Sequence, residues 1–121
     1  MSRDEALYLE DIRACCEKVS RYVSGLTLEQ LRSDDRTTDA VVRNLEIIGE
    51  AAKHVSEDMR DRIPGIEWRK VAGLRDILAH AYFGVDEDII WDIVQHHVPG
   101  LFERVRQFLA TEGIPGAEPQ Q

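Results

Sequence analysis

The chain has 121 residues, of which 43% are hydrophobic and 31% are charged, and its formal net charge is −8. This length suits one domain, and the composition is typical of a globular protein that buries its own core. The acidic balance argues against a protein that coats nucleic acid by bulk charge, although it is compatible with a local basic site.

The first expected element is a helix over about residues 3–24, because apolar residues recur there at steps of three and four. Gly25 is expected to end this helix. The two cysteines lie within it and are adjacent, which places them poorly for bridging each other and predicts free, buried thiols in a reducing compartment. The apolar stripe of this helix consists of Tyr8, Ile12, Cys15, Val19 and Tyr22.

A short helical turn over residues 28–32 is expected next. Thr27 and Gln30 have the spacing of a capping box, in which each residue satisfies a backbone N–H of the other. The polar segment 33–38 is expected to be a loop, with Asp39 in the first turn of the helix that follows.

The second long helix has the most regular pattern in the chain. Its apolar residues step by 4, 3, 4, 3 and 4, a heptad-like stripe that favours near-parallel packing in a bundle. Pro64 and Gly65 mark the next break. Glu46 and Glu50 lie four residues apart on this helix, and without a Glu-x-x-His motif we expect them to form a solvated face. The stripe comprises Val41, Leu45, Ile48, Ala52, Val55 and Met59.

Two further helices are expected before residue 112. Gly84 is expected to end the third helix, and Asp86 is a good N-cap for the fourth. Pro99 lies inside the fourth pattern and is expected to kink that helix or divide it. The inward residues of the third are Trp68, Val71, Leu74, Leu78 and Ala81, and those of the fourth are Ile90, Ile93 or Val94, Val98, Leu101, Val105 and Phe108.

The expected fold is an all-α antiparallel four-helix bundle with one short extra helical turn. No run alternates at period two, and no repeat or linker divides the chain, so residues 1–112 are expected to form one helical domain. Residues 113–121 contain two prolines and two glycines and are expected to be a disordered tail. Residues 1–20 are charged throughout and no apolar run has the length of a membrane span, which predicts a cytoplasmic protein without membrane contact.

The segment 73–83 carries the strongest functional signal, because it places Arg75, His80 and Tyr82 close together in an otherwise apolar helical pattern. Arginine is a fixed cation that matches phosphate geometry, and histidine exchanges protons near neutral pH, so the pair predicts chemistry on a phosphodiester. Asp76 lies four residues before His80 on the same helical face, where its carboxylate would orient the imidazole. From the spacing alone, a surface arginine and a histidine at the edge of the core are the favoured interpretation.

The remaining polar residues give weaker signals. His96 and His97 are neighbours and point about 100° apart on a helix, and no HExxH, paired CxxC or His/Cys cluster is present, so no metal or cofactor is expected. Residues 59–75 hold five bases and two acids, an excess of 5 − 2 = 3 positive charges. This excess fits either a local nucleic-acid site or an ordinary solvated face.

Several separated motifs in this sequence resemble the HepT-like branch of the HEPN superfamily. They are the run RNLEIIGEA at 43–51, PGIEW at 64–68, and GLRDILAHAY at 73–82 with its continuation FGVD and Trp91. The resemblance covers about residues 5–110 and implies a helical bundle that forms a homodimer, with the Arg-x4-His motifs of two subunits facing each other across a cleft. The position after the arginine is often Asn in this family and is Asp76 here, a difference that bears on cleavage efficiency.

The resemblance also implies a function. Proteins of this branch look like toxins of type VII toxin–antitoxin pairs that cleave RNA without a metal, which assigns catalysis to Arg75 and His80 with Asp76 in support. The implied partner is an MntA-like minimal nucleotidyltransferase antitoxin, which adenylylates the tyrosine of an Arg-x4-His-x-Tyr motif, here Tyr82. The alternative is a non-catalytic helical module that holds a nucleotidyltransferase or another protein, and the acidic composition favours this alternative.

Overall fold

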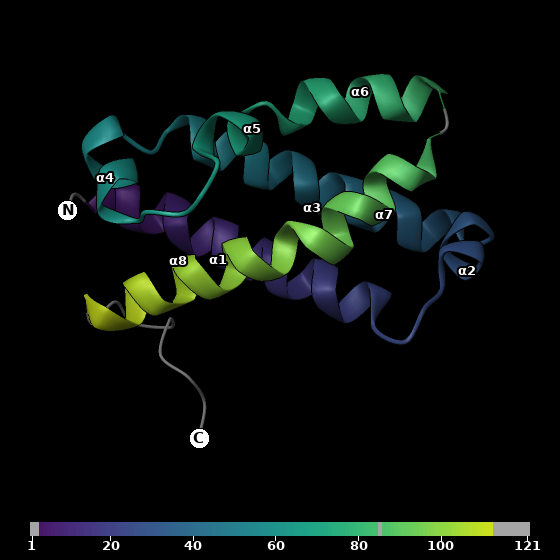
Figure 1. Ribbon diagram of the computed structural model, residues 1–121, viewed down its shortest axis with the longest axis horizontal. Coiled ribbons are helices and arrows are strands. Elements are labelled where there is room, and N and C mark those ends of the chain that lie inside the picture. Colours follow the sequence, from purple (N-terminus) through teal and green to yellow (C-terminus); the bar gives the residue numbers. More distant parts are fainter. Residues whose placement is uncertain (1–2, 85, 113–121) are drawn as a thin grey trace.

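The computed structural model describes residues 3–84 and 86–112, with the side chains of residues 4–79 and 86–112. Within these ranges the chain is almost entirely helical and contains no strand (Figure 1). The helices are α1 (Arg3–Val23), α2 (Leu28–Arg32), α3 (Asp35–Lys53), α4 (Glu57–Arg62), α5 (Trp68–Ala72), α6 (Leu74–Gly84), α7 (Glu87–His96) and α8 (Val98–Thr111).

Four helical rods that alternate in direction form an antiparallel bundle (Figure 1). They are α1, α3, α5 followed by α6, and α7 followed by α8. Helix α1 packs along both α3 and α8, while α3 also contacts α5 and α6. The short helices α2 and α4 lie at opposite ends of the bundle. The predicted all-α four-helix architecture with an extra helical turn is therefore confirmed.

The core consists of the apolar faces of these rods. Every residue of the stripe predicted for 41–59 is buried. In α1 the prediction is wrong at Tyr22, which is 37% exposed, because the buried face shifts by one residue and takes Val23 instead. Both cysteines are buried, and desolvation raises the pKa of Cys16 to about 12, which keeps its thiol protonated. The resulting face of α1 comprises Leu9, Ile12, Cys15, Cys16, Val19 and Val23.

The loop predicted at 33–38 is wrong, because α3 already begins at Asp35. The Asp34 carboxylate accepts a hydrogen bond from the Thr37 N–H at 3.0 Å and another from the Thr37 hydroxyl at 2.7 Å. Asp34 is therefore the N-cap of α3, and Asp39 lies in the second turn rather than the first. A single capping side chain outweighs the polar composition of this segment.

The helix predicted to run through Met59 in fact ends at Lys53. A new helix, α4, begins after Ser56, whose hydroxyl accepts the Met59 N–H at 3.2 Å. Arg60 donates from Nη2 to the Ala52 carbonyl at 2.8 Å, which ties α4 to the last turn of α3. Val55 within this break and Met59 after it remain buried, so the apolar period continues although the helix does not.

The third and fourth rods are each divided in two. Gly73 separates α5 from α6, so the continuous helix predicted there is wrong, whereas its end at Gly84 is confirmed. The predicted effect of Pro99 is confirmed, because α7 and α8 separate at His97 and the proline lies in the first turn of α8. Asp86 caps α7 as predicted, accepting the N–H groups of residues 88 and 89 at 3.1 and 3.3 Å.

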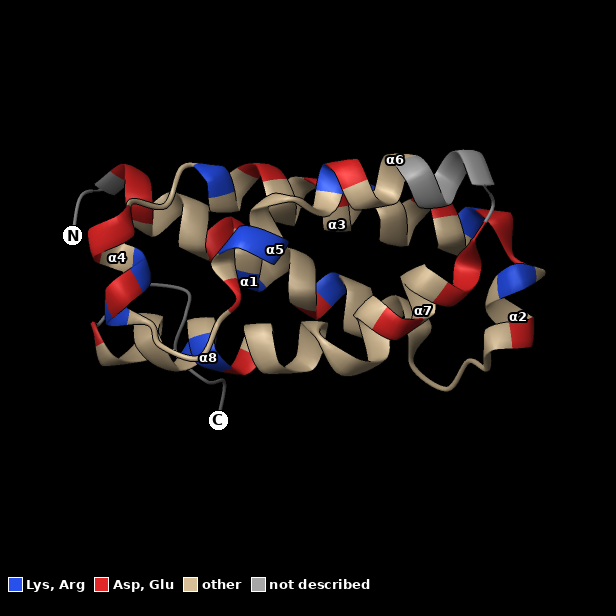
Figure 2. Ribbon diagram, turned by 45° about the horizontal axis from the view of Figure 1, so that its top comes forward, with Lys and Arg blue, Asp and Glu red and all other residues tan. Residues whose placement is uncertain are grey.

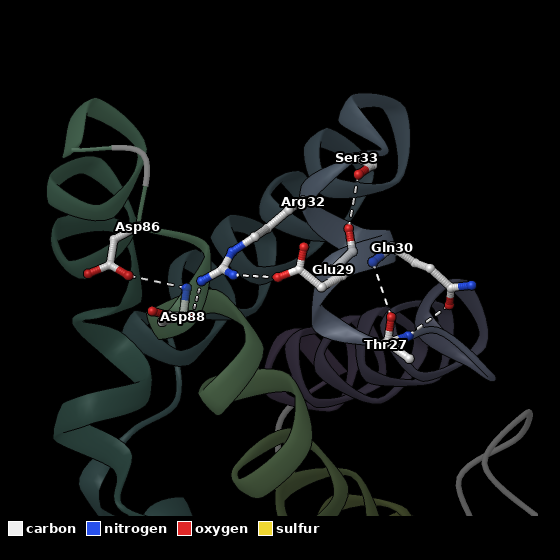
Figure 3. Close-up of polar contacts among 7 residues, drawn as sticks. All are labelled: Thr27, Glu29, Gln30, Arg32, Ser33, Asp86 and Asp88. Atoms are coloured by element: carbon white, nitrogen blue, oxygen red, sulfur yellow. Dashed lines mark hydrogen bonds and ion pairs between the residues drawn. The ribbon is translucent and has the colours of Figure 1, made fainter.

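A polar cluster joins α2 to the start of α7 (Figure 3). Arg32 donates to Glu29 at 2.9 Å and to Asp88 at 2.6 Å, which links two helices that are 56 residues apart in sequence. The predicted capping box is present, with Gln30 N–H to Thr27 Oγ1 at 3.2 Å and Thr27 N–H to Gln30 Oε1 at 2.9 Å. The start of α7, directly after the end of α6, is thereby tied to the rest of the bundle.

Gly49 allows α3 to approach the junction of α5 and α6 closely. A Cβ atom at position 49 would lie 3.1 Å from the Leu74 Cβ, 3.3 Å from the Val71 carbonyl oxygen and 3.5 Å from the Arg75 nitrogen. Two of these three atoms belong to the backbone and cannot move aside by a change of rotamer. The missing side chain therefore sets the distance between α3 and the start of α6.

No helix in the described part of the chain is both long enough and apolar enough to cross a membrane. The tail predicted at 113–121 lies outside the described residues.

Replacing Gly49 with Ala should destabilise the protein by about 1–3 kcal/mol, the usual cost of overpacking. Gly100→Ala is the matched control, because Gly100 is also helical and its added Cβ would meet no atom within 4 Å. The free energy of unfolding of Gly100→Ala should be unchanged or up to about 1 kcal/mol higher than that of wild type, because Ala has the higher helix propensity. Urea unfolding measures both, and equal stabilities for the two variants would contradict the close approach at Gly49.

Asp34 should make the stability of the bundle depend on pH. Its hydrogen bond from the Thr37 side chain, followed by the one from the Thr37 backbone, lowers the pKa of the Asp34 carboxyl. A carboxyl group whose pKa is lowered in the folded state stabilises the protein at pH values above its unfolded-state pKa of about 3.9. This stabilisation is lost as the pH falls through the folded-state pKa. The free energy of unfolding of wild type, relative to Asp34→Asn, should therefore fall between about pH 5 and pH 2.

Asp39→Asn serves as the control for this comparison, because Asp39 lies in the second turn of α3 and makes no described capping bond. A wild-type advantage over Asp34→Asn that stays constant across this pH range would show that the cap does not depend on the charge of Asp34.

Candidate active site

The start of α6 fixes the position of Arg75. The Gly73 carbonyl accepts the N–H groups of Asp76 at 3.1 Å and Ile77 at 3.2 Å, which begins the new helix immediately after the break. Leu74 and Leu78, four residues apart, are 7% and 1% exposed and hold one face of α6 in the core. Arg75 follows Leu74 at a rotation of about 100°, which turns its side chain toward solvent.

The Arg75 guanidinium is accessible and lightly held. Its side chain is 55% exposed, and Nη1 donates to Glu50 Oε2 at 3.3 Å. Within the described side chains, neither Nε nor Nη2 of Arg75 has a hydrogen-bond acceptor. The Nε–Nη2 edge is the planar fork that binds the oxygens of a carboxylate or a phosphate in pairs, so it is open for a substrate.

Glu50 stands among three basic side chains from two helices. Besides Arg75, its carboxylate faces Lys53 Nζ at 3.8 Å and His54 Nε2 at 3.7 Å. The hydrogen bond from Arg75 is the largest of the effects that lower the pKa of Glu50, and the charge of Lys53 is the next largest of these. The His54 ring stacks on Tyr8 of α1, with centroids 4.6 Å apart and an angle of 12° between the planes.

The expectation that Glu46 and Glu50 lie on a solvated face is confirmed. Both residues are exposed, but Glu50 has a specific partner 25 residues away in the chain. Sequence reasoning missed this role because a helical period says nothing about which exposed residues of different helices meet. The adjacent Gly49 is the one local signal, since a glycine inside a helix can mark a place where another segment packs closely against the helix backbone.

Helix α6 carries the backbone of all four predicted site residues. Asp76 is exposed and lies one helical turn before position 80, as the sequence predicted. The side chains of His80 and Tyr82 lie outside the described residues, so their convergence with Arg75 stays a prediction. What the structure brings together is Arg75 of α6 with Glu50 of α3, a contact that the sequence did not predict.

The basic excess of residues 59–75 does not form one continuous surface. Arg60 is committed to the end of α3, Arg62 pairs with Glu112 at 2.5 Å, and Lys70 pairs with Glu67 at 2.8 Å. Figure 2 shows the same interleaving of acidic and basic residues along the bundle. Most of this charge therefore serves local contacts, which favours the solvated-face interpretation except at Arg69 and Arg75.

A cavity of about 370 Å³ lies beside α6, between α3 and the start of α8. Its lining combines apolar and polar side chains, but Arg75 does not belong to it. Within residues 4–79 and 86–112 no three His, Cys, Asp or Glu side chains are grouped so that they could hold a metal ion. The apolar lining includes Leu45, Ile48, Leu74, Ile77 and Leu101, and the polar lining includes Glu67, Lys70, His97 and Arg104.

Comparison with known proteins matches residues 12–108 to the family model described as "Ribonuclease HepT-like". A protein of Thermococcus cleftensis named "Probable ribonuclease HepT" is 41% identical over 110 residues, which cover 88% of this chain and 100% of the relative. A protein of Caldanaerobacter subterraneus subsp. tengcongensis named as a "Putative RNase" is 40% identical over 105 residues, 87% of this chain and 94% of the relative. No solved structure matches. Since the family model spans most of the bundle and these relatives align over nearly their whole length, the chain belongs to the HepT-like family of the HEPN superfamily.

Proposed function

We propose that this protein is a toxin that cleaves RNA as a metal-independent endoribonuclease, with Arg75 and His80 as its catalytic residues. The observation that carries the proposal is the accessible Arg75 guanidinium, whose Nε–Nη2 edge is open at the start of the helix that also contains His80. Family membership and the ribonuclease names of two relatives support the same reaction.

Cleavage of RNA without a metal requires three contributions from side chains. The attacking 2′-OH loses a proton, the phosphorane that forms carries additional negative charge, and the leaving 5′-oxygen gains a proton. Arg75 neutralises the charge that develops on the phosphate. His80 exchanges the protons, a contribution of roughly 10²–10⁴-fold.

A homodimer supplies what a single chain lacks. One chain offers one His80, whereas the reaction needs both a base and an acid. Two motifs that face each other across a cleft provide two imidazoles, one for each proton transfer. Asp76, exposed and one turn before position 80, orients the imidazole and raises its basicity.

An MntA-like nucleotidyltransferase antitoxin would silence the enzyme by adenylylating Tyr82. The tyrosine lies seven residues, or about two helical turns, after Arg75, so the added group falls on the same side of the helix as the arginine. The adenylyl group brings bulk and a negatively charged phosphate into the cleft, and both exclude RNA.

The first test is cleavage of RNA in excess EDTA by purified protein whose intact mass shows an unmodified Tyr82. Wild type should leave 2′,3′-cyclic phosphate ends, and Arg75→Ala and His80→Ala should each lower the rate by about 10²–10⁴-fold. Arg21→Ala is the control, because Arg21 is also an exposed arginine and lies in the last turn of α1, outside the basic segment 59–75. Full activity in a folded His80→Ala dimer would rule out this mechanism.

The second test concerns regulation by the antitoxin. Tyr82→Phe removes the hydroxyl that accepts the adenylyl group and leaves the ring in place. Cells that express this variant together with the nucleotidyltransferase should stop growing, whereas wild type with the same partner should be tolerated. A Tyr82→Phe protein that the partner still neutralises would show that the antitoxin acts by binding alone.

The alternative function is a non-catalytic module that holds a protein partner. The net charge of −8 and the local pairing of Arg60, Arg62 and Lys70 favour it, because they leave little basic surface for RNA. An unmodified wild-type dimer that cleaves no RNA would favour this alternative.

A further inference from the structure

The carboxylate of Glu50 is the one acidic group among the described residues that contacts Arg75. It lies on α3, outside the motif that contains the proposed catalytic residues, and 25 residues before Arg75 in the chain. We propose that Glu50 is a positioning residue, which orients the Arg75 guanidinium for the scissile phosphate. This inference rests on the proposed ribonuclease function and adds a residue from another helix to it.

The geometry of the contact leaves the substrate side of the arginine open. Glu50 Oε2 accepts from Nη1 alone, at 3.3 Å. A guanidinium is planar and rigid, so a hold on Nη1 restricts the direction in which the Nε–Nη2 edge points. A phosphate can then bind in bidentate fashion to the free Nε–Nη2 edge, while the Glu50 carboxylate holds Nη1 in place.

The local charge allows this carboxylate to stand beside a phosphate. Arg75 and Lys53 contribute +1 each and Glu50 contributes −1, so the group keeps a net charge of +1 with His54 neutral. Glu50 therefore cancels only part of the positive potential around it. The hydrogen bond from Arg75 lowers the pKa of Glu50, which keeps the carboxylate charged at neutral pH.

Glu50 has two structural neighbours on its own segment, Gly49 and His54. The close approach at Gly49 sets the spacing between α3 and the first turn of α6. One turn further along α3, His54 stacks on Tyr8 and faces the second oxygen of Glu50 at 3.7 Å. An exposed ion pair contributes only about 0–1 kcal/mol to stability, so the value of this one lies in orientation rather than in folding.

The test compares Glu50→Gln with the control Glu46→Gln. The control removes the same charge one turn earlier on the same helix, and Glu46 contacts no described basic residue. The substrate is an RNA oligonucleotide with one cleavage site, and kcat and KM are measured separately. Glu50→Gln should lower kcat/KM about 10- to 100-fold, since a misplacement of ~1 Å can cost 10²-fold. Glu50→Asp, which keeps the charge on a shorter arm, should recover part of this loss, and Glu46→Gln should match wild type.

A double-mutant comparison separates positioning from general damage to the fold. If Glu50 acts through Arg75, then Glu50→Gln should cost nothing further in an Arg75→Ala background. An equal loss in both backgrounds would overturn the proposal, as would a Glu50→Gln protein that cleaves as fast as Glu46→Gln. Faster cleavage by Glu50→Gln would also overturn it, because the carboxylate would then compete with RNA for Arg75.

The outcome for wild type distinguishes this proposal from the proposed function. If wild type cleaves and Glu50→Gln equals Glu46→Gln, the positioning role fails and the ribonuclease stands. If unmodified wild type does not cleave, the ribonuclease fails, and binding of the 2′-O-methyl form of the same oligonucleotide replaces the kinetic measurement. Weaker binding by Glu50→Gln than by Glu46→Gln would then support an orienting role in binding, and equal affinities would overturn it.

Discussion

The close packing of α3 against the junction of α5 and α6 is the constraint on which the site depends. Gly49 has no side chain, so the Leu74 Cβ and the backbone at Val71 come within reach of α3. Leu74 and Leu78 then bury one face of α6. With that face fixed, Arg75 is turned outward beside Glu50, and the two exposed side chains come within reach of each other.

The apolar period predicted the buried residues of this fold better than it predicted the ends of the helices. The stripe from Val41 to Met59 is buried throughout, although the helix breaks inside it. Burial follows from spacing alone, whereas a helix end depends on whether a nearby side chain satisfies free backbone groups. Asp34 and Ser56 do this at positions where the apolar period gives no signal.

The candidate site likewise has one part that could be predicted from the sequence and one part that could not. The types and spacing of Arg75, Asp76, His80 and Tyr82 were visible in the sequence, and the helix that contains them is present. Glu50 could not be assigned from the sequence, because its contact with Arg75 depends on how far apart two helices lie and how they are rotated. That arrangement follows from the packing at Gly49. The sequence shows a glycine at this position but not which segment packs against it.

The chain begins and ends its described part at one end of the bundle, and the last turn of α6 lies at the other (Figure 1). Arg62 of α4 and Glu112 after α8 form an ion pair at the first end, which holds the end of α8 against the short helix there. A label attached beside the first turn of α1 or the last turn of α8 therefore lies at the end of the bundle opposite to the last turn of α6 (Figure 1). A tether attached there leaves the last turn of α6 at the end of the bundle that is directed toward solution.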